Sequence, residues 1–205
     1  MNKEWSELNK TMQAQIKKKD TYKMGIDTLF NLRRQLMQTL VSFKEDLCRE
    51  DFNAIPFINA DGYHSKTIAY SIWHIFRIED IVAHTVITED EQVFFTGNYQ
   101  VRINSPIITT GNELVKQQIA DFSKQLNLEE LYSYIFEVRE STEKILERFS
   151  YDELKWKIPD ERKGYLKSLN VVNCDEKAIW LIDYWCSKDI RGLIQMPFSR
   201  HWIMH

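Results

Sequence analysis

In its first half the chain contains the segment Ser71-Ile72-Trp73-His74-Ile75-Phe76-Arg77-Ile78-Glu79-Asp80. Apolar residues recur through this segment and beyond it at helical spacing, and together they nearly encircle the axis: Ile68, Ile72, Ile75, Ile78, Ile81, Val82 and Val86. A helix that is hydrophobic on most of its sides is buried. We therefore predict a central helix over about residues 66–87, with Ser65 as its N-cap.

Helical periodicity also dominates the chain on both sides of this segment. Asn127 followed by Glu130, and Ser150 followed by Glu153, have the spacing of capping boxes. Pro197 suits the first turn of a helix, so we place a break near Gln195-Met196. The other predicted helical regions are an N-terminal accessory helix within 1–19, 21–48, 115–126, 128–149, a short helix after Ser150, and 175–205.

Turn-forming residues separate these helices. Three segments are predicted to be loops or connections without regular helices: 51–64, 88–111 and 159–174. Because no alternation of period two persists anywhere, a sheet is not supported. The prediction is an all-α fold. It is an up-down four-helix bundle with additional short helices and a long connection between the second and third core helices, forming one domain over residues 1–205.

Composition excludes several classes of function. The formal net charge of −3 gives no electrostatic support for nucleic-acid binding. No span of roughly 18 uncharged apolar residues is present, so no membrane helix is expected. The polar N-terminal residues do not resemble a signal peptide. Three widely spaced cysteines, Cys48, Cys174 and Cys186, do not form a disulfide framework. These features together favour a cytoplasmic protein.

Two histidines near the end of the sequence, His201 and His205, are four residues apart. In a helix this spacing places both imidazoles on one face. Catalytic zinc-type sites usually take three protein ligands, and His74 on the central helix is the best third candidate. A buried imidazole needs a polar partner, which a metal ion can supply. The alternative is that these histidines are hydrogen-bonded residues of an aromatic core.

Other polar and aromatic residues are weaker candidates for the predicted metal site and its surroundings. We expect His84 to be partly exposed at the end of the central helix, and His64 to lie in the preceding loop. Glu79, Asp80 and Asp183 are either carboxylates that orient imidazole N–H groups or helix-surface salt-bridge partners. Six aromatic residues are expected to be core, with some lining a pocket: Trp73, Trp180, Tyr184, Trp185, Phe198 and Trp202.

The quoted segment with His74, together with the His201/His205 pair, resembles the DinB-like (YfiT-like) superfamily of metal-binding four-helix bundles. The resemblance covers about residues 20–205. It implies a triad of His74, His201 and His205 around a divalent ion such as zinc or nickel, and no other catalytic position carries over. Similar proteins include thiol S-transferases and a thiol-dependent isomerase. The segment 88–126 has no counterpart that we can map onto the family.

Three functions follow as hypotheses. The first is a metal-dependent transferase that joins a small thiol to an electrophile. The second is a non-catalytic stress-response bundle that binds a metal or another ligand. The third is a structural bundle in which the histidines are merely packed. A homodimer is compatible with any of them.

Overall fold

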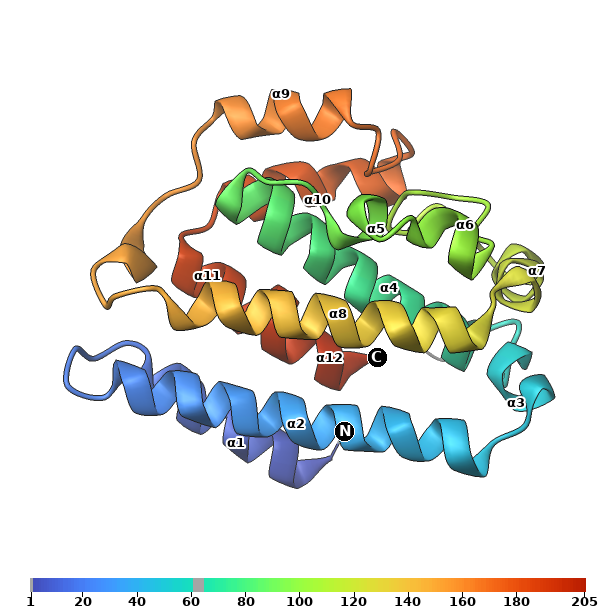
Figure 1. Ribbon diagram of the computed structural model, residues 1–205, viewed down its shortest axis with the longest axis horizontal. Helices are drawn as coiled ribbons and strands as arrows, with labels where there is room; N and C mark the ends of the chain where they lie inside the picture. Colours follow the sequence, from blue (N-terminus) through green and yellow to red (C-terminus); the bar gives the residue numbers. More distant parts are fainter. Residues whose placement is uncertain (1, 61–64) are drawn as a thin grey trace.

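The computed structural model describes residues 2–60 and 65–205 (Figure 1), so the predictions for His64 and for the turn Asp61-Gly62 lie outside the described residues. The described chain is helical and contains no β-strand beyond one isolated bridge between Lys157 and Asp189. The prediction of an all-α fold is confirmed for this part of the chain. Within it, no helix is both long and apolar enough to cross a membrane.

The α-helices, in chain order, are α1 (Lys3–Gln15), α2 (Tyr22–Asp46), α3 (Arg49–Asn53), α4 (Ile68–Asp80), α5 (Val93–Thr96), α6 (Tyr99–Ile103), α7 (Gln117–Gln125), α8 (Leu128–Glu147), α9 (Glu161–Ser168), α10 (Glu176–Cys186), α11 (Ile190–Gln195) and α12 (His201–Met204). The described residues also contain two π-helical stretches, η2 (Ile81–Thr88) and η4 (Met196–Arg200), and the 3₁₀ turn η3 (Glu153–Lys155).

The central helix lies where the sequence predicts it. Every residue from 72 to 86 is buried, across α4 and its π-helical continuation η2. The predicted cap is wrong by two residues: Thr67, not Ser65, precedes the first turn, and its Oγ1 accepts a 3.0 Å hydrogen bond from the backbone N–H of Tyr70. The helical path ends at Glu89, which has the left-handed φ of 61°.

Three segments surround α4. Helix α8 runs alongside α4, and α2 contacts α8 (Figure 1). The C-terminal run α11–η4–α12 contacts both α4 and α2 through η4. Buried side chains form two clusters, one around the first half of α4 and one around η2, α10 and α11. The C-terminal run is thereby brought against the buried helix that carries His74. The assignment of the whole chain to one domain stays a prediction.

Helix α1 packs along α2 because Gly25 lets the two backbones approach closely. A Cβ atom at position 25 would lie 2.5 Å from Cγ2 of Ile16 and 2.9 Å from its backbone nitrogen. A glycine in a helix normally costs stability relative to alanine. Here the absence of a side chain leaves the space in which the end of the N-terminal helix packs against α2.

Several predicted loops contain short helices. Segment 159–174 includes α9, segment 88–111 includes α5 and α6, and α3 extends into the segment predicted to begin as a loop at Asp51. Contacts distant in sequence stabilise them. Asp80 of α4 accepts hydrogen bonds from the backbone N–H groups of Val93 and Phe94, both 2.9 Å, and so caps α5. Arg162 of α9 donates to the carbonyl of Thr85 and to Glu89.

Other local predictions hold. The side chain of Asn127 accepts from the backbone N–H of Glu130 at the start of α8. Ser150 and Glu153 make the reciprocal pair of bonds expected of a capping box. The predicted break near Gln195-Met196 coincides with the change from α11 to η4. An additional break at residues 187–189, where Asp189 caps α11, was not predicted.

Candidate metal centre

His74 is held in one tautomer by a backbone carbonyl. It is 4% exposed, and its Nδ1 lies 2.7 Å from the carbonyl oxygen of Thr110. Because a carbonyl oxygen can only accept, Nδ1 carries the hydrogen and Nε2 keeps its lone pair. The ring also stacks on Tyr70, one turn earlier in α4, with centroids 5.4 Å apart. The Nε2 lone pair is therefore fixed in direction.

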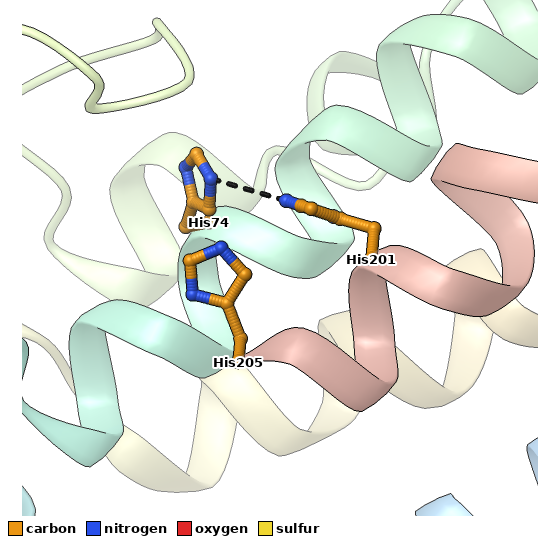
Figure 2. Close-up of side chains that lie close together, drawn as sticks. All are labelled: His74, His201 and His205. Carbon is orange, nitrogen blue, oxygen red and sulfur yellow. Dashed lines mark hydrogen bonds between the residues drawn. The ribbon is translucent and has the colours of Figure 1, made fainter. Parts of the chain in front are cut away.

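His201 and His205 approach that lone pair from α12 and the residue after it. Nε2 of His201 lies 3.3 Å from Nε2 of His74, and Figure 2 shows the three rings converging. The ring of His205 lies 4.7 Å, centroid to centroid, from each of the other two. One nitrogen from each ring lies within 4.8 Å of the others, so a single ion could be held by all three. The three predicted residues therefore do lie together.

Burial keeps these imidazoles neutral. It lowers the pKa of His74 to about 4, with the carbonyl of Thr110 opposing the shift and the charge of Lys66 adding to it. Burial, followed by the neighbouring histidines, also lowers the pKa of His201 and of His205 well below the usual range. Neutral imidazole is the form that binds metals. Among the described residues, Nδ1 of His201 is buried with no hydrogen-bond partner, while Nε2 of the same ring faces His74.

A buried ionic network fastens the terminal histidines to α4. Arg33 of α2 and Glu79 of α4 are both fully buried and form two hydrogen bonds, of 2.7 and 2.9 Å. Arg33 also donates to the carbonyl of Phe198, and Nε1 of Trp202 donates to Glu79 at 2.8 Å. Phe198 and Trp202 flank His201 in the sequence. The network therefore positions the turn that carries the ligand candidates.

A strap formed by residues 108–111 covers one face of α4. Arg77 donates from Nε to the carbonyl of Ile108, His74 donates to Thr110, and the hydroxyl of Tyr70 donates to the carbonyl of Gly111. The three donors occur at steps of four and three residues, so they share one side of the helix. The segment 88–126, which we could not map onto the family, thus supplies the hydrogen-bond partner of His74.

The histidines open onto a cavity of about 450 Å³, a volume within the range of small-molecule sites. All three line it, together with Lys66, Tyr70 and Asn112. The remaining lining residues are mainly apolar or aromatic, and they include Ile78, Trp180, Leu181, Tyr184, Trp185, Met196, Pro197 and Met204. A bound ion would therefore be reachable by a small molecule.

The prediction that the six aromatic residues are mainly core is confirmed for four of them and wrong for Trp180. Trp180, Tyr184 and Trp185 line the cavity, although Trp180 is 50% exposed and is not a core residue. The remaining predicted core aromatics are fully or almost fully buried: Trp73, Phe198 and Trp202.

Glu79 and Asp80 do not hydrogen-bond to the imidazoles of the histidine cluster, although Asp80 lies 4.0 Å from Nε2 of His84. Glu79 bonds to Arg33 and Trp202, and Asp80 bonds to the start of α5 and to Tyr134. Both are fully buried, so neither is a surface salt-bridge partner. Asp183 does form such a surface pair, 3.0 Å from Lys163.

His84 is buried rather than partly exposed, which corrects the prediction. Its Nδ1 lies 2.7 Å from Asp90, and its Nε2 lies 3.0 Å from the hydroxyl of Ser141. The order Asp, His, Ser is that of a hydrolytic triad. Ser141, however, lies inside α8, where the backbone N–H groups are used by the helix and cannot form an oxyanion hole beside the hydroxyl. We regard this cluster as a structural link between η2 and α8.

The fold and site together define an all-helical protein with three neutral histidines at a cavity. Comparisons of the chain with protein-family models, curated proteins and solved structures found no match. The resemblance to the DinB-like superfamily consequently stays a prediction.

The sequence did not predict that Lys66 lines the cavity or that Arg33 anchors the C-terminal turn. Arg33 nevertheless interrupts the apolar stripe of its helix, which is a signal in the sequence.

Proposed function

We propose that this chain is a divalent-metal-binding helical bundle of the DinB-like kind, with His74, His201 and His205 as ligands. One observation supports the proposal above all others. Two buried imidazoles and the partly buried His205 converge so that one nitrogen of each lies within 4.8 Å of the others. Burying a polar imidazole whose nitrogens lack hydrogen-bond partners costs free energy, and coordination of a shared metal ion would offset that cost.

The ligand set favours a transition metal, and the DinB-like resemblance implies zinc or nickel. Imidazole nitrogen suits zinc, copper, iron and nickel, whereas magnesium and calcium require oxygen ligands. The cluster contains three histidines and no carboxylate among the described residues. Three protein ligands leave a coordination position free for a small molecule, as in catalytic zinc sites.

We propose further that the protein transfers a small thiol to an electrophile. An ion at this site would lower the pKa of a thiol bound to it. The chain's own contribution would be the three neutral ligands and a largely apolar cavity that excludes water around the reacting molecules. The sulfur forms a bond to carbon, the leaving group departs with its electron pair, and the thiol proton passes to solvent.

A non-catalytic metal-binding protein is the second candidate. One observation favours it: among the described residues that line the cavity there is no Asp or Glu side chain to accept a proton. The two candidates share the same metal site and differ in turnover. A homodimer is compatible with both.

The test uses protein without a purification tag, loaded with zinc or nickel and assayed with several small thiols against a panel of electrophiles. Metal-dependent thioether formation that is lost in His74→Ala and kept in His84→Gln would support the transferase. His84 is a suitable control because it is also a buried histidine of the central helix but lies outside the cluster. If the protein binds one equivalent of metal but consumes no thiol, the transferase is rejected and the non-catalytic metal-binding protein is supported.

A further inference from the structure

A second cavity, of about 350 Å³, lies between α1, α2, α4 and α12. Its walls are mostly apolar, and the residues that form them include Trp5, Leu36, Leu40, Phe43, Ile68, Ile72, Ile75, Trp202 and Ile203. Lys66 and His205 line both this cavity and the one that adjoins the histidine cluster. The second cavity is therefore a neighbour of the candidate metal centre, with walls of its own.

Among the described residues that line the second cavity, there is a single cationic side chain and no anionic one. Lys66 is the only Lys or Arg residue in this described lining, which contains no Asp or Glu side chain. Within the described part of the chain, Lys66 forms no ion pair; its ammonium group instead lies 4.9 Å from the ring centroid of Tyr70. A half-buried cation without an anionic partner is costly, because desolvation is not repaid by an opposite charge.

We propose that this cavity binds an apolar monocarboxylic acid, with its hydrocarbon part between α1, α2 and α12 and its carboxylate on Lys66. The volume lies within the range of roughly 300–1,000 Å³ that small-molecule pockets occupy. Such pockets combine apolar walls with a few polar groups that fix orientation, here Lys66 with Thr39 and Ser71. One ammonium group matches one carboxylate. This site goes beyond the proposed metal function and does not require a bound ion.

The test compares three ligands with the same chain and different head groups: octanoate, octanol and octylamine. Each is titrated calorimetrically into the full chain, once after chelator treatment and once with zinc. We expect octanoate to bind with a stoichiometry of one in both forms, octanol to bind more weakly, and octylamine not to bind. Trp5 and Trp202 line the cavity, so their fluorescence should respond to octanoate.

Two variants locate the ligand. Lys66→Gln should weaken octanoate binding about tenfold or more, the loss expected for a hydrogen bond to a charged group, and should leave octanol binding unchanged. Lys177→Gln is the matched control, since Lys177 is close enough to Lys66 to influence its pKa but lines neither cavity. Ser71→Leu, which fills part of the cavity, should reduce the binding of both octanoate and octanol.

Several results would overturn the proposal. Equal octanoate affinity in Lys66→Gln and the wild type would exclude Lys66 as the carboxylate partner. Binding that requires zinc and disappears in His74→Ala would mean that the carboxylate binds the metal, which would retain the metal site and reject this one. Absence of octanoate binding, or multiple weak sites unaffected by Ser71→Leu, would reject the cavity as a specific site. By contrast, Lys66-dependent octanoate binding by a protein without any metal affinity would support this site and reject only the metal proposal.

Discussion

Trp202 and Glu79 are joined by a 2.8 Å hydrogen bond from the indole Nε1–H to a carboxylate oxygen. Glu79 belongs to the helix that carries His74, and Trp202 follows His201 directly. The carboxylate is also paired with the fully buried Arg33, whose guanidinium group lies 4.5 Å from the centroid of the Trp202 ring. The relative position of the histidines therefore depends on a buried ion pair contributed by α2 and α4.

The first prediction concerns that ion pair. Arg33→Met leaves the buried carboxylate of Glu79 without its cation and should lower the free energy of unfolding by roughly 3–5 kcal/mol. The double variant Arg33→Met/Glu79→Leu should lose less than the sum of the two single variants, because no uncompensated charge remains. Urea denaturation measures both. Lys144→Met, which breaks an exposed pair with Glu140, is the control and should leave the urea midpoint almost unchanged.

A second prediction concerns Gly111, whose φ of 76° is unfavourable for other residues. In Gly111→Ala the new Cβ would lie 3.1 Å from the Tyr70 ring, and the preceding carbonyl of Thr110 would shift relative to His74. We expect a stability loss of roughly 1–3 kcal/mol. Zinc affinity should fall about tenfold or more, as when other hydrogen-bond partners of ligating histidines are lost. Competition with a chromogenic chelator measures the affinity, and an unchanged value would argue against the role of Thr110.

The contact between α1 and α2 gives a third prediction. Gly25→Ala should destabilise the protein by about 1–3 kcal/mol, since the Cβ–Ile16 overlap outweighs the gain in helix propensity. Gly164→Ala in α9 meets no atom within 4 Å and should stabilise it by roughly 0.5–1 kcal/mol. Thermal unfolding of the two variants should therefore shift in opposite directions. A gain in stability for Gly25→Ala would show that α1 does not pack as described.

The fourth prediction is a pH dependence of the metal-free protein. Burial lowers the pKa of His74 from 6.5 to about 4 on folding. Between these two pH values the unfolded chain binds a proton at His74 and the folded chain does not. Stability is therefore fully present above about pH 6.5 and declines as the pH falls towards 4. In His74→Gln the decline across this interval should be shallower. Equal slopes in chemical denaturation of wild type and variant would contradict the burial of a neutral His74.

The sequence predicts the helical class and the pairing of His201 with His205 because both depend on local spacing. Apolar periodicity identifies α4, and an interval of four residues places His201 and His205 on one face. The partner of His74 could not be found in this way, because the carbonyl of Thr110 is a backbone atom without a side-chain signal. The helix α9 was missed since its stability depends on Arg162 reaching η2, a contact distant in sequence.

The exposure of His84 was predicted wrongly for a related reason. Its position near the end of the helical pattern suggested a frayed, solvated turn. In the structure Asp90 and Ser141 close over the ring from a following loop and from α8. Neither residue has a recognisable spacing to His84, so only the folded chain brings them together.

The most direct test of the central claim is anomalous scattering at the zinc absorption edge from crystals of tag-free, zinc-loaded protein. We expect one peak about 2.0–2.1 Å from a ring nitrogen of each of His74, His201 and His205. A peak bound elsewhere, or no peak among these rings at full zinc loading, would contradict it.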